Sequence, residues 1–236
     1  MKNQSITEAM LQFIEESPTA FHAAANVEAL LLENGFEKLE NLAEGALVPG
    51  GSYYTMQNGS AVLAVKIPEN PAKGFRIAAS HSDSPCFKIK EVPEMKVENT
   101  YVKLNVEKYG GMILSPWLDR PLSVAGRVFV TGKDGKPEAK LVNLKKDLLI
   151  IPNVAIHFNR EINNGFAYNP QTDMAPLMGL DQAGALELVP CQDAGLLLQT
   201  VRSLPQGSTP VPRVISAGCV VRVDRSLWVD MLRNLI

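Results

Sequence analysis

The residue type best suited to chemistry is histidine, and the sequence holds three histidines. His81 follows the apolar run FRIAAS and stands two residues before Asp83, within the segment HSDSP. In an extended segment, side chains two residues apart project to the same face, so this imidazole and this carboxylate can meet. Histidine is a common zinc ligand, and a nearby carboxylate can orient it. The pattern suits a metal site, but such pairs often arise by chance, so the spacing alone favours an ordinary structural role over a metal site.

His157 stands in PNVAIHFNR at the end of another apolar run, close to two polar residues, Asn159 and Arg160. Those neighbours could hold an anion or a carbonyl oxygen. The alternative is a histidine at a strand end that faces solvent. His22 lies beside Phe21 in an alanine-rich stretch of a predicted helix, and we interpret it as a structural or surface residue.

Two helices are predicted ahead of these positions. Apolar residues recur at near-helical spacing after Ser5, which can cap a helix that runs to Glu16. A second helix is predicted from Ala20 to Asn34, with Gly35 as its C-terminal stop. The first 40 residues are therefore expected to be mainly helical.

Strand signals follow from residue 52. The runs SYYTMQ and SAVLAVKI flank Asn58-Gly59, which predicts a β-hairpin with a tight turn. FRIAAS, residues 75–80, predicts a short buried strand that ends at His81, and CFKIK predicts another strand. His81 is thus expected at the C-terminal end of a strand, where ligand-binding groups gather in α/β sheets.

The sequence changes character at residue 91. From there to about residue 160, runs rich in β-branched residues are separated by Gly and Pro turns, with little helical periodicity. These runs predict a separate β-rich module. Residues 161–176 are rich in Asn, Gly and Pro, which predicts a loop.

Composition limits the function classes. The chain has 236 residues, 46% hydrophobic and 20% charged, with a formal net charge of −2, so it can bury a sizeable core and nucleic acid is not an expected partner. The apolar runs are too short to span a bilayer, and the N-terminus lacks the apolar region of a secretory signal. Three scattered cysteines indicate no disulfide framework. We expect a cytoplasmic protein with no membrane partner.

Several ordered segments carry a resemblance to a known family. AASHSDSPCFKIK resembles the His-Thr-Asp-Ser-Pro segment of the M18 metallo-aminopeptidases, the aspartyl aminopeptidase-like family. LQFIEESPTAFHAAANVEALLLENGF resembles its opening, and GGSYYTMQNGSAVLAVKI resembles its first hairpin. YGGMILSPWLDRPLSVAGRV and NVAIHFNREINNGFAYNPQTDMAPLMG resemble two later segments. The resemblance covers residues 6 to about 180, so the chain resembles the N-terminal portion of such an enzyme.

The resemblance implies an α/β fold: a partial metallopeptidase α/β sheet domain interrupted by a β-rich dimerisation domain. The implied domains are residues 1–90, the N-terminal part of the metallopeptidase domain; 91–180, the dimerisation domain; and 181–236, a divergent tail that could partly return to the catalytic domain. The family commonly forms large homo-oligomers, a dodecamer in its best-known form.

The resemblance also implies a site and a reaction. His81 would be a zinc ligand, and Asp83 would orient the metal site. His157 would reach a neighbouring subunit's active site and donate to the oxyanion of the tetrahedral intermediate, a role worth ~3 kcal/mol for one donor. Two Zn²⁺ ions would assist removal of an N-terminal residue, often acidic, from a peptide substrate.

The sequence departs from the family in its second half. A two-zinc site needs a bridging carboxylate, a Glu-Glu pair, a further carboxylate and a second histidine. Here the one Glu-Glu pair is Glu15-Glu16 in the first predicted helix, and no histidine follows His157. Asp224 is a candidate metal ligand by its distance along the chain, and the alternative is an ordinary surface aspartate. The tail from about Cys191 does not resemble the family.

These departures leave two further functions open. The chain alone is expected to be weakly active or inactive, with exposed apolar faces on the strands around residues 60–90 because much of the covering sheet is expected to be missing. One alternative is a non-catalytic oligomerisation or interaction module descended from such an enzyme. A weaker alternative is a related zinc peptidase of M42 type, against which the WLDR and IHFNR segments argue.

Overall fold

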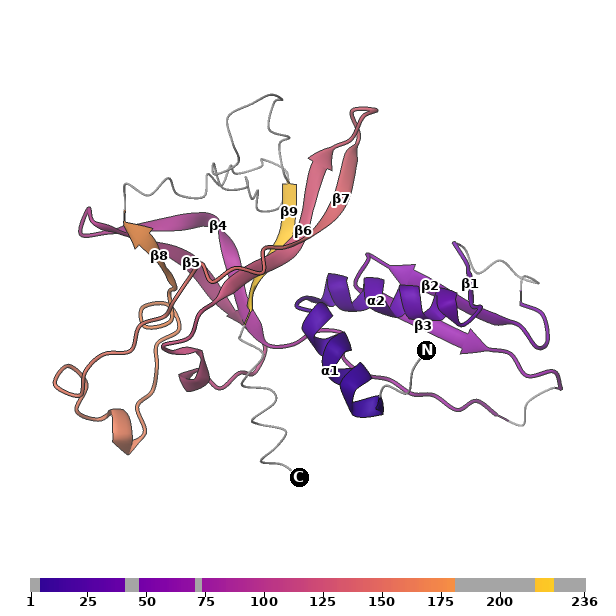
Figure 1. Ribbon diagram of the computed structural model, residues 1–236, viewed down its shortest axis with the longest axis horizontal. Helices are drawn as coiled ribbons and strands as arrows, with labels where there is room; N and C mark the ends of the chain where they lie inside the picture. The colour runs from indigo at the N-terminus through magenta and orange to yellow at the C-terminus, as the bar shows by residue number, and fades with distance from the viewer. Residues whose placement is uncertain (1–4, 41–46, 71–73, 181–214, 223–236) are drawn as a thin grey trace. The chain divides into compact units, whose positions relative to one another are not determined.

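The computed structural model describes residues 5–40, 47–70, 74–180 and 215–222 (Figure 1). The chain divides into two compact units between Ser84 and Pro85, called unit 1 and unit 2 below. His81 and Asp83 belong to unit 1, and His157 belongs to unit 2. The predicted tail domain, residues 181–236, lies outside the described residues except for one strand.

Unit 1 begins with two helices, α1 (Ile6–Glu16) and α2 (Ala20–Glu33). The hydroxyl of Ser5 accepts the amide N–H of Glu8 at 3.2 Å, and the Glu8 carboxylate accepts the amide N–H of Ser5 at 3.0 Å. This reciprocal capping satisfies two amides at the helix start. Gly35 follows α2 with a φ of 75°, which glycine adopts without steric cost. Both predicted helices are confirmed.

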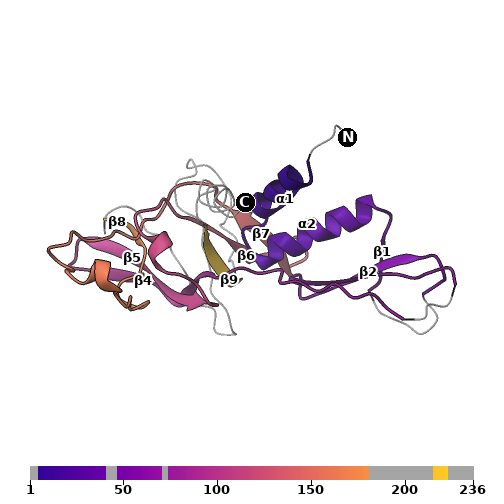
Figure 2. The same ribbon diagram turned by 90° about the horizontal axis from the view of Figure 1, so that it is seen from below.

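The sheet of unit 1 has the order β1-β2-β3. Its strands are β1 (Glu37–Lys38), β2 (Ser52–Gln57) and β3 (Ala61–Lys66). Asn58 and Gly59 connect β2 to β3 with φ values of 53° and 67°, as a tight hairpin turn requires. The predicted hairpin is confirmed, and α2 lies along the sheet in both views (Figures 1 and 2).

The predicted buried strand at residues 75–80 is wrong. This segment has no strand structure, and the side chains of Phe75 and Ile77 are 81% and 88% exposed. A strand forms only where a neighbour accepts and donates its backbone hydrogen bonds, and no described strand pairs with these residues. The apolar run therefore joins no ladder among the described strands, and His81 does not stand at the end of a strand as expected. Leu63 in β3, at 62% exposed, adds to the apolar surface of unit 1.

Unit 2 is built on one antiparallel sheet with the order β7-β6-β9-β4-β5-β8. The strands are β4 (Cys86–Val97), β5 (Tyr101–Tyr109), β6 (Ser123–Thr131), β7 (Pro137–Asn143), β8 (Leu177–Leu180) and β9 (Ile215–Arg222). Short helices η1 (Ser115–Trp117) and η2 (Ile162–Asn164) interrupt the loops. β4 runs through residue 91, where the sequence changes character.

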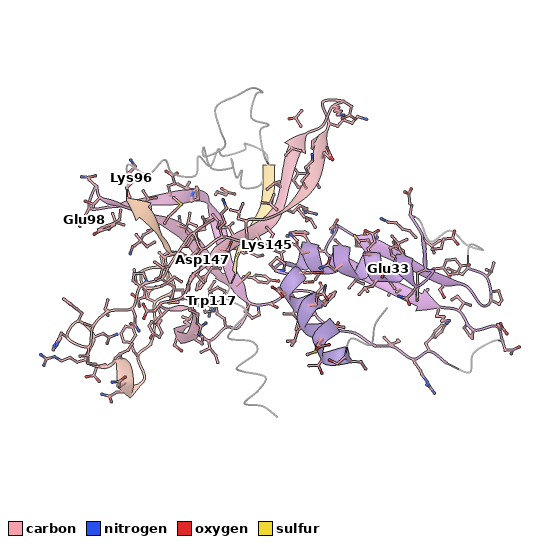
Figure 3. All side chains as sticks on the ribbon, in the orientation of Figure 1. Glu33, Lys96, Glu98, Trp117, Lys145 and Asp147 are labelled. Carbon is pink, nitrogen blue, oxygen red and sulfur yellow. The ribbon has the colours of Figure 1, made fainter. Side chains whose placement is uncertain are left out.

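A continuous apolar core stabilises unit 2. The rings of Phe87 in β4 and Trp117 in η1 meet edge to face with centroids 5.0 Å apart, a favoured aromatic geometry (Figure 3 labels Trp117). The other buried core side chains come from β4, β5, β6 and the loops that follow: Ile89, Leu104, Val106, Leu122, Val124, Val128, Leu149, Ile151 and Met174. In the described part of the chain, no helix is long and apolar enough to cross a membrane.

Candidate metal centre

His81 and Asp83 lie in the exposed segment that follows residues 75–80. The Nδ1 atom of His81 is 3.0 Å from the Oδ1 atom of Asp83. The His81 side chain is 93% exposed and that of Asp83 is 32% exposed. Between them, the Ser82 hydroxyl donates to the carbonyl oxygen of Ser60 at 2.9 Å. That bond ties the segment to the start of β3.

The contact with Asp83 selects a tautomer of His81. An ionised carboxylate can only accept hydrogen bonds, so the Nδ1 atom of His81 carries the proton in this contact. In the neutral imidazole, the Nε2 atom then holds the lone pair that a metal ion needs. A histidine that donates its other ring N–H to a carboxylate is the usual arrangement of a zinc ligand. The pair can therefore supply one oriented nitrogen ligand.

The rest of a metal shell is not among the described residues. These residues contain no group of three or more His, Cys, Asp or Glu side chains that could hold a metal ion. A zinc site usually needs at least three protein ligands. His81 and Asp83 thus fit one ligand and its orienting carboxylate, and no more. Asp224, the other predicted ligand, lies outside the described residues.

His157 occupies an exposed turn of unit 2. The amide of Phe158 donates to the carbonyl oxygen of Ala155 at 2.8 Å, and that of Asn159 donates to Ile156 at 3.2 Å. The turn follows the last bridge residue, Ile151, and carries no strand at His157. An imidazole in this position can donate a hydrogen bond to a bound group.

His22 belongs to the start of α2. Its Nδ1 atom is 2.8 Å from the hydroxyl of Thr19, and its amide donates to the same hydroxyl at 3.3 Å. Thr19 is the N-cap of this helix and is buried. These contacts agree with the structural interpretation of His22, since the ring supports a helix cap.

The sequence predicts no role for one polar residue that the structure shows to be well connected. Asp119, in the WLDR segment, has a φ of 56°, and its backbone and side chain both bind the chain that leads to His157. Its contacts join residues more than thirty positions apart, so no local pattern could reveal them.

Comparison with known proteins settles the family. The profile described as aminopeptidase I zinc metalloprotease (M18) matches residues 13–200. The chain belongs to the M18 peptidase family. It is 47% identical over 184 residues to a probable M18 family aminopeptidase 2 of Clostridium acetobutylicum. It is 40% identical over 176 residues to the protein of that name in Pseudomonas putida strain GB-1.

The M18 chain spans less than half of these relatives. The Clostridium match covers 76% of this chain and 42% of the relative, and the Pseudomonas match covers 74% and 41%. The family resemblance predicted from the sequence is confirmed, including its restriction to the N-terminal portion of the relatives.

Solved structures confirm the fold. Ape4 in a cryo-EM complex with Nbr1 matches with a TM-score of 0.74 and 29% identity, over 91% of this chain and 43% of that chain. Chaetomium thermophilum mApe1 matches with a TM-score of 0.71 and 26% identity, over 92% and 50%. The mApe1 dodecamer of S. cerevisiae shares the fold with a TM-score of 0.69 at 23% identity, over 93% and 48%. The M18 chain therefore has part of the aminopeptidase fold.

Proposed function

We propose that this M18 chain contributes one edge of a zinc-dependent aminopeptidase site. The observation that carries the proposal is the 3.0 Å contact between the Nδ1 atom of His81 and Asp83, on a ring that is 93% exposed. An exposed histidine held by a carboxylate is prepared to bind a metal ion through its other nitrogen. The family description as a zinc metalloprotease names the ion.

His81 would hold zinc, and Asp83 would keep the ring in the metal-binding tautomer. A pair of bound zinc ions would polarise the scissile carbonyl and lower the pKa of a bound water toward ~7. Asp224 remains our candidate for a further ligand. With so few donors among the described residues, this polypeptide by itself would bind zinc weakly and turn over slowly or not at all.

His157 would donate to the oxyanion in the site of a neighbouring copy. Its exposed turn supports this role, because the ring is accessible to a second molecule. Ile156 and Phe158, at 45% and 84% exposed, flank it with apolar surface suited to contact between copies. A homo-oligomer is therefore part of the proposal, and the similar S. cerevisiae protein is described as a dodecamer.

The substrate would be the N-terminal residue of a peptide, with an acidic side chain preferred. The preference for acidic residues rests on the family resemblance, as does a cytoplasmic location. An aspartyl or glutamyl nitroanilide is therefore the first substrate to test.

Zinc content and turnover test the proposal together. The chain is dialysed to equilibrium against buffers of fixed zinc concentration, the bound zinc is measured by elemental analysis, and hydrolysis of the nitroanilide is followed with and without chelator. His81→Asn is expected to bind less zinc at each concentration, whereas the matched variant His157→Asn binds as much as the wild type because that ring is not a ligand. Equal zinc in the wild type and His81→Asn would contradict the ligand role. Rapid chelator-sensitive turnover would contradict the expected weak activity.

A second function is supported by a different observation. Unit 2 has a continuous core, while the described residues hold no group of three metal-binding side chains. The chain could therefore act as a non-catalytic oligomerisation module. Sedimentation of the protein would show a stable oligomer unaffected by chelator or by His81→Asn if this function applies.

A further inference from the structure

We propose that Asp119 is a positioning residue that sets the direction of the His157 loop, defined here as residues 154–160. The assignment deepens the proposed function, since it concerns the residue expected to donate to the oxyanion. The anchoring itself stands on contacts within this chain.

Asp119 binds the approach to the loop at two points. Its amide N–H donates to the carbonyl oxygen of Ile151 at 2.9 Å. Its Oδ1 atom accepts the amide N–H of Asn153 at 2.8 Å. The two contacts lie on either side of Pro152, so one residue clamps the chain where it leaves the core. The Oδ1 atom of Asn153 then accepts the amide of Val154 at 2.9 Å, which extends the clamp into the loop.

The clamp rests on a base of buried residues that pair with one another. Leu118, the neighbour of Asp119, forms a parallel bridge with Ile151, and Leu122 forms an antiparallel bridge with Leu149. Ile151 and Leu122 are fully buried and Leu149 is nearly so, all within the core of unit 2. Residues 152–158, in contrast, are all exposed. Asn153 thus binds Asp119 at the second residue of the exposed stretch, directly after the chain leaves this base.

The backbone of Asp119 shows why a carboxylate matters here. Its φ of 56° lies in the left-handed region, which glycine adopts without cost and other residues rarely adopt. Glycine would suit the backbone better but could not accept the amide of Asn153. An aspartate at this position keeps a tolerable left-handed conformation and adds the acceptor. The carboxylate of Asp119 therefore supplies a hydrogen-bond acceptor for Asn153, which the turn itself does not require.

The position of Asn153 is transmitted to His157. Three residues separate them, and the hydrogen bond from the amide of Phe158 to the carbonyl oxygen of Ala155 closes a tight turn with Ile156 and His157 as its central residues. A turn closed in this way moves as one piece, so a change in direction at Asn153 moves the ring of His157. Asp119 acts on the imidazole through this backbone and does not touch it.

The test uses the full chain and three variants. Asp119→Gly keeps the left-handed backbone and removes the acceptor, while Asp119→Asn keeps both the backbone preference and an oxygen acceptor. Asp134→Gly is the matched control, because its Oδ1 atom accepts the amide of Lys136 at 3.1 Å in the turn between β6 and β7. Amide hydrogen exchange at Asn153 and the imidazole NMR signals of His157 are measured. Only three histidines need assignment.

Asp119→Gly is expected to speed exchange of the Asn153 amide on the order of tenfold and to shift the His157 ring signals. Asp119→Asn should restore most of both readouts, and Asp134→Gly should leave both unchanged. The amide of Leu104, which donates to Pro176 at 2.8 Å, reports the stability of the core.

The inference is overturned if Asp119→Gly leaves Asn153 and His157 unchanged, or if exchange at Leu104 rises as much as at Asn153. If Asp119→Gly does not fold, Asp119→Asn decides alone. Its weaker acceptor should then give a smaller change in the same direction at Asn153 and His157, and no local change would overturn the inference. No readout uses turnover, so failure of the proposed enzymatic activity would leave the result for Asp119 intact.

Discussion

The two units of this M18 chain differ in how far their apolar residues find partners. In unit 2, the described strands pair in one sheet and bury a continuous core around Phe87 and Trp117. In unit 1, the described buried side chains are few, and Phe75 and Ile77 are exposed. The segment that carries His81 therefore lies in the unit with the weaker packing. Unit 2 should fold on its own contacts, while the His81 segment depends on contacts that the described residues do not supply.

Truncating one phenylalanine in each unit should give the largest difference between the two units, in the free energy of unfolding. Phe87→Ala removes a fully buried ring and should lower the free energy of unfolding by roughly 3–5 kcal/mol. Phe75→Ala removes an 81% exposed ring and should change it by less than about 0.5 kcal/mol. Urea denaturation measures both, with the fluorescence of Trp117 reporting unit 2 and the far-UV circular dichroism of α1 and α2 reporting unit 1. Similar losses for the two variants would mean that Phe75 is packed in solution.

A polar contact among Tyr54, Glu28 and Lys38 holds α2 to the sheet of unit 1. The hydroxyl of Tyr54, a buried residue, donates to the carboxylate of Glu28 at 3.0 Å, and Lys38 binds the same oxygen at 2.6 Å. Tyr54→Phe leaves the ring in place and removes the donor to a charged group, which should cost about 1–2 kcal/mol. Amide exchange in α2 and β2 measures the loss, with the exposed Tyr101→Phe as control. Unchanged exchange in Tyr54→Phe would count against this contact.

The same contact predicts a dependence of unit 1 on pH. The hydrogen bond from Lys38 lowers the pKa of Glu28, burial opposes that effect, and the Tyr54 hydroxyl lowers the pKa further. A carboxyl whose pKa is lower in the folded state stabilises the fold above its ordinary value of 4.5. That stabilisation is lost as the pH falls through the folded pKa.

Exchange in α2 should therefore accelerate as the pH is lowered from about 6 to about 3, after correction for the intrinsic exchange rate. Glu28→Gln should flatten this dependence, because the amide does not titrate. Glu33→Gln, at the exposed end of α2 (Figure 3), should retain it. A profile unchanged by Glu28→Gln would show that another group controls the acid sensitivity.

The sequence predicts best where the physics is local. Asn58-Gly59 requires positive φ values that few residue pairs tolerate, so the hairpin and its turn could be predicted. His81 and Asp83 stand two residues apart, a spacing that allows their side chains to meet on one face, and the two side chains do meet. The strand at residues 75–80 failed because an apolar run does not reveal whether a neighbouring strand is available. The clamp of Asp119 on Asn153 could not be predicted, since it joins distant residues.

The metal-binding state of His81 tests the central claim most directly. Zinc is titrated into the chain while the imidazole nitrogens of the three histidines are followed by NMR. The account predicts that the Nε2 signal of His81 shifts on zinc binding while the Nδ1 atom stays protonated, and that Asp83→Asn weakens zinc binding by roughly 10- to 100-fold. Zinc that leaves the His81 signals unchanged, or an affinity unaffected by Asp83→Asn, would contradict it.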